Sequence, residues 1–369
     1  MPARLARTHH WLSCEDRPVT DQPGGLADSA FLRAARGQPA PHVPVWFMRQ
    51  AGRSLPEYRA VREGVAMLDA CTRPELVVEI TMQPVRRHGV DAAILFSDIV
   101  LPLKALGVDL DIVSGVGPVV AEPVRDLAAA EAIPSFDGDR VGFVTEAVNE
   151  LVAQLGGTPL VGFAGAPYTL ASYLIEGGPS KDHALTKAMM HGAPDVWRAL
   201  MDRLVGISAG FLRVQAEAGA SAVQLFDSWA GGLTPADYRE HVLPYSSAVF
   251  ERIADLGVPR VHFGVATGEI LADMASVDVE VMGVDWRVPL DRAVQRIRPH
   301  QAVQGNLDPA LVFAPWDVIE AKAGEVLELG RTAPGHIFNL GHGVLPSTDP
   351  DVLTRLVDLI HSYEFAVAS

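Results

Sequence analysis

The stretch Val43-Pro44-Val45-Trp46-Phe47-Met48-Arg49-Gln50-Ala51-Gly52-Arg53 changes abruptly from apolar to cationic. Its apolar part, residues 43–48, has the composition of a short strand that is buried on both faces. Arginines directly after a buried strand are costly unless an anion meets them. Gly52 lets a ligand approach the backbone, and guanidinium groups match carboxylates and phosphates with a planar fork of donors. The stretch therefore predicts a strand that ends in an anion-binding site built around Arg49 and Arg53.

Two further arginines, Arg59 and Arg62, follow closely and have a different expected role. They lie in a predicted helix near acidic residues such as Glu57 and Glu63, at spacings where side chains on one helix face meet. We therefore expect Arg59 and Arg62 to form ion pairs within the chain. The same pairing is the alternative for the two arginines at the strand end, although their position there favours a ligand.

Seven more short apolar runs follow the first one, separated by long helical stretches. The eight runs are 43–48, 92–96, 160–163, 222–226, 260–263, 279–284, 301–304 and 336–340. None alternates strictly between apolar and polar residues, as expected for parallel strands covered on both faces. Eight β/α repeats in one chain predict an α/β protein with a single-domain (β/α)8 TIM barrel, spanning residues 26–369.

Helix boundaries can be predicted from capping residues. Thr72 and Glu75 have the spacing of a capping box before an apolar stretch, and Gly89 lies where that helix would stop. Thr234, Asp308 and Asp349 each precede a proline, which favours the first position of a helix. The connection between the second and third predicted strands, residues 97–159, is long enough to hold extra elements. Residues 1–25, rich in charge, proline and glycine, are expected to be a disordered leader.

Composition narrows the possible partners of this 369-residue chain. A net charge of −15 argues against nucleic acid and against an anionic membrane as partner. The N-terminus has no continuous apolar segment and no apolar run of 18 residues occurs, so we expect a cytoplasmic protein. Cys14 and Cys71 lie far apart, without the spacing of a disulfide framework or a cysteine-rich metal site. Glycine-rich nucleotide loops, HExxH and the Gly-x-Ser-x-Gly elbow are absent from the sequence.

Polar residues follow the predicted strands, where a barrel places its chemistry. They include Arg49, Gln50, Arg53, Ser97, Asp98, Tyr173, Asp227, Ser228, Trp229, Thr267, Asp285, Trp286, Arg287, Asn306, Asp308 and His342. Several have structural alternatives, since a strand-end Asp can cap a helix and a Tyr can be a core aromatic. His342 lies between glycines that expose its ring. The set has arginines, carboxylates, a tyrosine and a histidine without a metal cluster, which fits proton transfer on a polyanionic substrate.

Several long motifs resemble those of the uroporphyrinogen decarboxylase family. The stretch 44–59 is similar to the first signature of that family, and Gly162 to Tyr173 is similar to the second. The segments 95–99, 226–229, 304–309 and 339–343 fit in the same order. The resemblance runs from about residue 27 to about residue 365, which leaves the leader outside it.

The resemblance implies a (β/α)8 enzyme of haem synthesis that uses no cofactor and no metal and forms a homodimer. It would remove the four acetate carboxylates of uroporphyrinogen III, giving coproporphyrinogen III and CO2. The substrate carries eight carboxylates, which accounts for the arginines. The residues that would bind it are Arg49, Gln50, Ala51, Gly52, Arg53, Asp98, Tyr173, Phe226, Ser228 and His342. The expected catalytic residues are Asp98, Arg49, Tyr173 and His342.

Asp98 has a role that can be argued from chemistry. The family places this residue against the pyrrole N–H groups at the centre of the macrocycle. Loss of CO2 from a pyrrole acetate needs an electron sink, which protonation of the adjacent ring carbon provides. A carboxylate that accepts the N–H bonds stabilises the resulting cation more than the neutral ground state. The proton donor stays open among Arg49, Tyr173, His342 and water.

Two other functions compete with decarboxylation. A corrinoid or thiol methyltransferase of the same barrel superfamily would need a zinc site built from His and Cys, and the cysteines lack that spacing. A non-catalytic tetrapyrrole carrier would not need Asp98 together with the whole arginine cluster. A zinc assay and an anaerobic incubation with the substrate would discriminate among the three.

Overall fold

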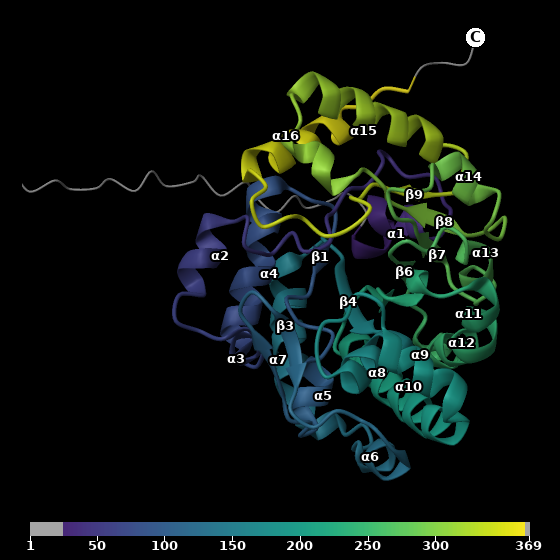
Figure 1. Cartoon of the computed structure of the whole chain (residues 1–369). Helices are drawn as coiled ribbons and strands as arrows, with labels where there is room; N and C mark the ends of the chain where they lie inside the picture. The colour runs from purple at the N-terminus through teal and green to yellow at the C-terminus, as the bar shows by residue number, and fades with distance from the viewer. Residues whose placement is uncertain (1–24, 366–369) are drawn as a thin grey trace, which may run out of the picture.

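A curled sheet of seven parallel strands forms the centre of the molecule in the computed structural model, which describes residues 25–365 (Figure 1). The strand order is β1-β4-β5-β6-β7-β8-β9, so neighbours along the chain are neighbours in the sheet. The strands are β1 (Ala93–Ile94), β4 (Leu160–Gly165), β5 (Ala222–Asp227), β6 (Arg260–Gly264), β7 (Val281–Gly283), β8 (Ala302–Gln304) and β9 (His336–Ile337). The predicted α/β class with a parallel sheet is confirmed.

Helices surround the sheet and connect its strands. They are α1 (Ala30–Ala35), α2 (Pro56–Val61), α3 (Met67–Cys71), α4 (Pro74–His88), α5 (Leu101–Ala105), α6 (Leu127–Ala132), α7 (Gly142–Leu155), α8 (Pro167–Glu176), α9 (Ala184–Gly192), α10 (Pro194–Glu217), α11 (Pro235–His241), α12 (Leu243–Glu251), α13 (Leu271–Met274), α14 (Leu290–Val294), α15 (Trp316–Gly330) and α16 (Pro350–His361). Short 3-10 turns occur at Leu26–Asp28, Gly138–Val141, Ala230–Gly232, Ala254–Leu256 and Pro309–Phe313. Because helices cover the sheet, nearly every strand residue is buried, which explains the absence of strict alternation.

The first predicted strand, residues 43–48, forms a single bridge instead of a regular strand. Val45 pairs in parallel with Phe338, just beyond β9, and the Phe338 N–H donates to Pro44 O over 2.8 Å. On its other side, the Asp91 N–H donates to Val45 O over 2.8 Å, just before β1. This segment therefore lies between the last and the first strand of the sheet.

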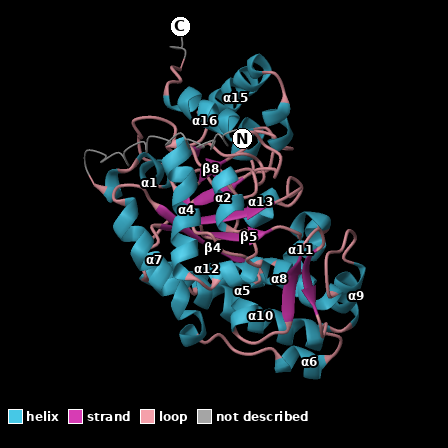
Figure 2. Cartoon of the chain, turned by 90° about the vertical axis from the view of Figure 1, so that its left-hand side faces the viewer, coloured by secondary structure: helices cyan, strands magenta, loops and turns pink. Residues whose placement is uncertain are grey.

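The long connection at residues 97–159 holds extra elements, as predicted. It contains α5, α6, α7 and an antiparallel hairpin of β2 (Leu110–Val113) and β3 (Gly117–Val120). The hairpin stands apart from the main sheet and lies near α8 (Figure 2). The Val120 N–H donates to Gly177 O over 2.9 Å, which ties the hairpin to the end of α8.

Most predicted helix boundaries are confirmed. The side chains of Thr234, Asp308 and Asp349 accept bonds from the first turns that follow them, and Gly89 ends α4 with φ 67°. The capping box at Thr72 is wrong, because its hydroxyl donates back to Asp69 O and α4 begins without a side-chain cap.

The predicted leader, residues 1–25, lies outside the described residues except for Gly25. Within residues 25–365, no helix combines the length and the apolar composition that crossing a membrane requires.

Candidate active site

Four of the predicted site residues lie near enough at the carboxyl ends of the strands for their charges to act on one another. The charge of Arg49 acts on Asp98, Tyr173 and His342, and the charge of Asp98 acts on Tyr173. These residues follow four different strands. Arg49 comes after residues 43–48 and Asp98 after β1, while Tyr173 lies in α8, which follows β4, and His342 comes after β9. Parallel strands bring their carboxyl ends to one edge, so residues far apart in sequence form one cluster there.

The backbone around Arg49 is shaped to present its side chain. Arg49 itself has φ 61°, an unusual value for a residue with a Cβ, and its side chain is exposed. Gln50 is fully buried and braces the turn, since it accepts from Phe47 N over 3.0 Å and donates to Ala92 O over 3.1 Å. A Cβ at Gly52 would lie 2.9 Å from the Arg49 carbonyl oxygen, so only glycine fits there.

Asp98 lies at the start of the turn that leads into α5. Its Oδ1 accepts a bond from Val100 N, two residues on, over 3.0 Å, which makes an Asx turn. The alternative that Asp98 caps the following helix is wrong, because α5 begins after Val100 without a side-chain cap. Burial raises the pKa of Asp98 above its ordinary value, although the Val100 N–H and the charge of Arg49 act in the opposite direction. The second carboxylate oxygen has no partner in the described structure and is available to a ligand.

Tyr173 projects from α8 and packs against Trp229, which follows β5. The two rings meet edge to face with centroids 6.0 Å apart. Burial, and then the charge of Asp98, raises the pKa of Tyr173 to about 12, so its phenol is neutral at physiological pH. Trp229 is fixed in turn by Thr169, whose hydroxyl accepts from Trp229 N over 3.4 Å and donates to the buried Asp227 over 3.3 Å.

His342 is a neutral imidazole with a defined donor. Burial, and then the charge of Arg49, lowers the pKa of His342 to about 4. The Gly343 N–H donates to Nδ1 over 2.5 Å, so the proton of the neutral ring lies on Nε2. A Cβ at Gly343 would lie 2.6 Å from Arg49 Cδ, which shows how closely this loop packs on the Arg49 side chain.

Phe226 and Ser228 come from the end of β5, and both are half-buried. The Phe226 ring meets Phe163 and Phe263 edge to face at 5.4 and 5.8 Å, which forms an aromatic floor across three neighbouring strands. Ala51 and Arg53 lie in the turn after residues 43–48, half-buried and exposed respectively.

The expected ion pairs of Arg59 and Arg62 with nearby acids are wrong. Arg59 Nη1 donates to the backbone oxygen of Arg53 over 2.7 Å, and Arg62 Nη1 contacts Met67 Sδ at 2.9 Å. Glu57 pairs instead with Arg87 of α4 at 2.7 Å, because tertiary packing brings that arginine closer. Arg59 thus supports the turn that carries Arg53.

The electrostatic effect of Arg287 on His342 is a feature that the sequence did not predict. Arg287 stacks on Trp286 at 3.8 Å and pairs with the buried Asp285 at 2.7 Å, yet its side chain stays 48% exposed. Its charge acts on His342, and the Trp286 ring lies 6.4 Å from the His342 ring. The sequence placed the Asp-Trp-Arg triplet at a strand end among the candidate site residues, and the pairing of Asp285 with Arg287, its alternative, is confirmed.

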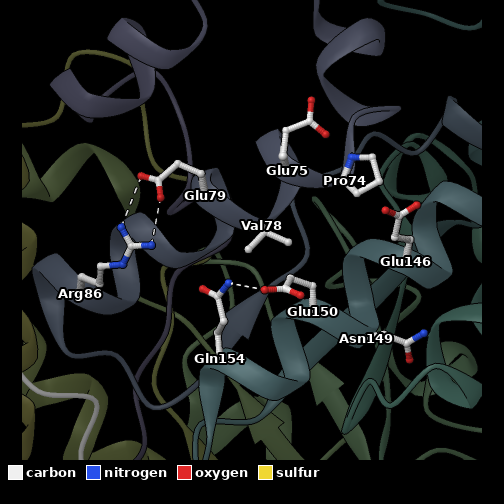
Figure 3. Close-up of a pocket in the computed structure, with 9 residues that line it drawn as sticks. All are labelled: Pro74, Glu75, Val78, Glu79, Arg86, Glu146, Asn149, Glu150 and Gln154. Carbon is white, nitrogen blue, oxygen red and sulfur yellow. Dashed lines mark hydrogen bonds and ion pairs between the residues drawn. The ribbon is translucent and has the colours of Figure 1, made fainter.

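A separate groove lies between α4 and α7, with a volume of about 780 Å³ (Figure 3). It is rich in glutamates and has Glu79 paired with Arg86 at 3.0 Å. It is lined by Pro74, Glu75, Val78, Glu79, Arg86, Glu146, Asn149, Glu150 and Gln154, none of which belongs to the predicted site. An acidic groove on outer helices does not suit a polyanionic substrate.

Two solved structures share this fold of a curled parallel sheet covered by helices. A methyltransferase from Methanosarcina mazei aligns with a TM-score of 0.75 over 91% of this chain and 98% of its own, at 22% identity. A B12-independent methionine synthase from a Shewanella species aligns with a TM-score of 0.52 over 77% of this chain and 86% of its own, at 11% identity. At these identities the likeness concerns the fold alone.

Sequence relatives define the family. The sequence profile of uroporphyrinogen decarboxylase (URO-D) matches residues 26–363. Proteins named uroporphyrinogen decarboxylase are 67% identical in a Nocardioides species (92% of this chain, 98% of theirs), 65% in Thermobifida fusca (91% and 93%) and 61% in Streptomyces coelicolor (95% and 99%). The chain therefore belongs to the uroporphyrinogen decarboxylase family.

Proposed function

We propose that this protein is a carboxy-lyase that removes the four acetate carboxylates of uroporphyrinogen III and yields coproporphyrinogen III and CO2. Family membership over nearly the whole chain supports this function. The observation that carries it to particular residues is that Arg49 and Asp98 follow residues 43–48 and β1 at the same edge of the sheet, where the charge of Arg49 acts on Asp98. A cationic rim around a carboxylate suits a ligand with acidic arms and an N–H-rich centre. The same central carboxylate would repel a phosphate ester placed against it.

The rim would bind the acidic side chains of the substrate. We propose that Arg49, Arg53 and the backbone of residues 50–52 hold carboxylates, since both guanidinium groups are exposed. His342 would donate from Nε2, because Nδ1 already accepts the Gly343 N–H. Tyr173 and Ser228 would donate from their hydroxyls, and Phe226 would pack against the macrocycle. Gln50 contributes by bracing the turn, because its side-chain amide is already bonded to the backbone.

Asp98 would stabilise the charge that develops during the reaction. A proton added to the ring carbon beside the acetate makes the pyrrole cationic. The bond between the methylene and the carboxylate then breaks, its electron pair enters the ring, and CO2 leaves. A second proton converts the methylene into a methyl group, and the ring carbon then releases the first proton, which restores the neutral pyrrole, so each decarboxylation consumes one proton. The free oxygen of Asp98 would accept the pyrrole N–H bonds and stabilise the cation in a site that excludes much of the water.

The structure narrows the choice of proton donor. A neutral imidazole with a pKa of about 4 carries no readily released proton, which disfavours His342 as the acid. Tyr173, with a pKa raised to about 12, is a weak acid at neutral pH. Guanidinium is weaker still in this role. We therefore assign His342 to binding, and Arg49, Tyr173 and water stay the candidate proton donors.

The architecture that we propose around this site is a closed (β/α)8 barrel in a single domain over residues 26–369. Support comes from residues 43–48, which bridge to Phe338 on one side and accept from Asp91 on the other. One contiguous hydrophobic core reaches from Phe31 to Ile360. A homodimer, a cytoplasmic location and a reaction without cofactor follow from the family resemblance and belong to the same proposal.

The deciding experiment is incubation of the purified protein with uroporphyrinogen III under anaerobic conditions with EDTA. We expect stepwise appearance of hepta-, hexa-, penta- and tetracarboxylate products, resolved by chromatography after oxidation. Tight binding without product would favour the carrier, and product formation that disappears with EDTA would favour a metal-dependent enzyme. The Asp98→Asn protein is the matched control, since it keeps the shape of the site and removes one charge.

A further inference from the structure

Two histidines and one aspartate from distant segments meet at the opposite end of the sheet from the candidate active site. His42 precedes residues 43–48, Asp91 precedes β1, and His361 ends α16. His42 Nε2 lies 2.8 Å from Asp91 Oδ1, and His361 Nε2 lies 2.8 Å from Asp91 Oδ2. The three offered ligand atoms all lie within 4.8 Å of one another.

From this geometry we propose that His42, Asp91 and His361 form a binding site for one divalent transition-metal ion, with Zn²⁺ as the expected occupant. Imidazole and carboxylate together suit Zn²⁺, Ni²⁺ and Co²⁺ better than Mg²⁺ or Ca²⁺, which take oxygen ligands. In a tetrahedral site with bonds of about 2.0 Å, two ligand atoms lie about 3.3 Å apart. Each imidazole nitrogen lies 2.8 Å from a carboxylate oxygen of Asp91, and all three ligand atoms lie within 4.8 Å of one another, so an ion would be admitted by moving the imidazoles away from the carboxylate.

The surroundings of Asp91 support a built site. The carboxylate is buried, and its Oδ2 also accepts a bond from Val45 N over 2.8 Å, which fixes its orientation. Outer contacts of this kind orient the ligands of metal sites. The two imidazole rings meet edge to face at 4.7 Å. Their side chains remain 27% and 32% exposed, so an ion and its remaining water ligands can reach them from solvent.

The proton balance of binding can be stated. Each Nε2 now lies in hydrogen-bond contact with Asp91, and it must offer a lone pair to coordinate a metal. A protonated imidazole therefore releases its Nε2 proton to solvent, and a neutral one moves its proton to Nδ1. Binding thus weakens as pH falls, because protons compete for the same nitrogens.

This site would be structural and separate from decarboxylation. Amino ends of barrel strands contribute to stability, whereas the chemistry lies at the carboxyl ends. The ion would join the start of the first predicted strand, the start of β1 and the end of α16. Bound zinc would consequently be no sign of methyltransferase activity in this protein.

The test uses the full chain without a polyhistidine tag, stripped with EDTA and dialysed. Zn²⁺ binding is measured by equilibrium dialysis, and Co²⁺ binding by its visible absorption. We expect one ion per chain, with affinity reduced by about tenfold or more in His361→Ala and in His361→Asn. The Asn variant is decisive, because its amide can still donate to Asp91 but is a poor transition-metal ligand.

Two control variants exclude the other histidine groups. His191→Ala disrupts a second cluster with Asp237 and His241, which is more exposed. The double variant His9→Ala with His10→Ala removes a pair outside the described residues. Affinity should be unchanged in both. Absence of saturable Zn²⁺ binding, equal affinity in His361→Asn, or loss of binding in either control would overturn the proposal. Decarboxylation with EDTA should be unaffected by His361→Asn, so this proposal and the enzymatic one can fail separately.

Discussion

At Asp98, burial and charge act against each other. Burial favours the protonated acid, whereas the Val100 N–H and the charge of Arg49 favour the carboxylate. The proposed mechanism needs the carboxylate, because only the ionised form stabilises a pyrrole cation. Because these effects oppose each other, a change in one neighbour alters the pKa of Asp98 and hence its protonation.

Replacing Asp98 by Asn tests that role directly. We expect kcat to fall by about 10²–10³-fold, the usual cost of losing one group that stabilises developing charge, with a small change in KM. The melting temperature should stay near that of the unmodified protein, since an amide oxygen can still accept from Val100 N. Asp111→Asn, a change on the hairpin, serves as the control for loss of one charge. Turnover close to that of the unmodified protein would contradict the role of Asp98.

The pH dependence of kcat/KM identifies the titrating group. Because the pKa of Asp98 is raised, activity should be lost on acidification at a pH above the ordinary aspartate value of about 3.9. In Arg49→Gln this acid limb should move to higher pH, since a charge that lowers the pKa of Asp98 is removed. In His342→Gln it should persist, because His342 has a pKa of about 4 and stays neutral. The profiles are compared after correction for ionisation of the substrate. If the acid limb disappeared in His342→Gln, the titrating group would be His342 and not Asp98.

At the scale of elements, the loop after β9 holds the Arg49 side chain in place. Gly341, His342 and Gly343 pass so close to their neighbours that added Cβ atoms would overlap Trp286 N at 2.2 Å and Arg49 Cδ at 2.6 Å. The turn after residues 43–48 and the loop after β9 therefore form one unit.

Gly343→Ala should displace Arg49 without unfolding the protein. Its φ lies in the range that alanine adopts, and the atoms that an added Cβ would meet are Cβ, Cγ and Cδ of Arg49, not backbone atoms. We expect kcat/KM to fall by up to about 10²-fold, as misplacement of a binding group by about 1 Å can cause. Gly142→Ala is the control, because its Cβ would meet nothing within 4 Å. Equal kinetics in the two variants would show that the loop does not hold Arg49.

At the scale of the whole molecule, the two ends of the sheet carry different tasks. The proposed substrate-binding residues Arg49, Arg53 and Asp98 lie at the carboxyl ends of the strands. At the amino ends, Asp91 forms hydrogen bonds that connect distant segments. Burial alone would raise the pKa of Asp91, but the hydrogen bonds from His361 and His42 hold it below its usual value. The hydrogen bond to Asp91 in turn raises the pKa of His42. Asp91 joins His42, 49 residues away, to His361, 270 residues away.

Stability should depend on pH through this contact. The lowered pKa of Asp91 in the folded protein stabilises the fold above about pH 3.9, the ordinary aspartate value. This stabilisation is lost as pH falls through the pKa of Asp91 in the folded protein. The raised pKa of His42 in the folded protein stabilises the fold below about pH 6.5, the ordinary histidine value. This stabilisation is lost as pH rises through the pKa of His42 in the folded protein. In EDTA, Asp91→Asn should therefore be less stable by about 1.5–3 kcal/mol near pH 5, with a smaller difference at pH 3 and pH 8. Urea unfolding measures this; a difference that is constant with pH would refute it.

Local sequence determined the α/β class, the order of the strands, the insertion at residues 97–159 and most helix ends. Those features depend on burial periodicity and capping, which operate over a few residues. Motifs long enough to show the family also named the residues that we propose for the site. Seven of the eight predicted strands form regular pairs in the described structure, and residues 43–48 form a bridge because their pairing is so short.

Only the tertiary structure decided which side chains meet. It assigned Glu57 to Arg87, committed the Gln50 amide to the backbone, and brought Arg287 beside His342. It also joined His42, Asp91 and His361, which share no motif. The physical reason is that pairing energies depend on distances and burial between segments far apart along the chain. The arginines after the first apolar run could thus be recognised from sequence, whereas their partners depended on how the sheet curls.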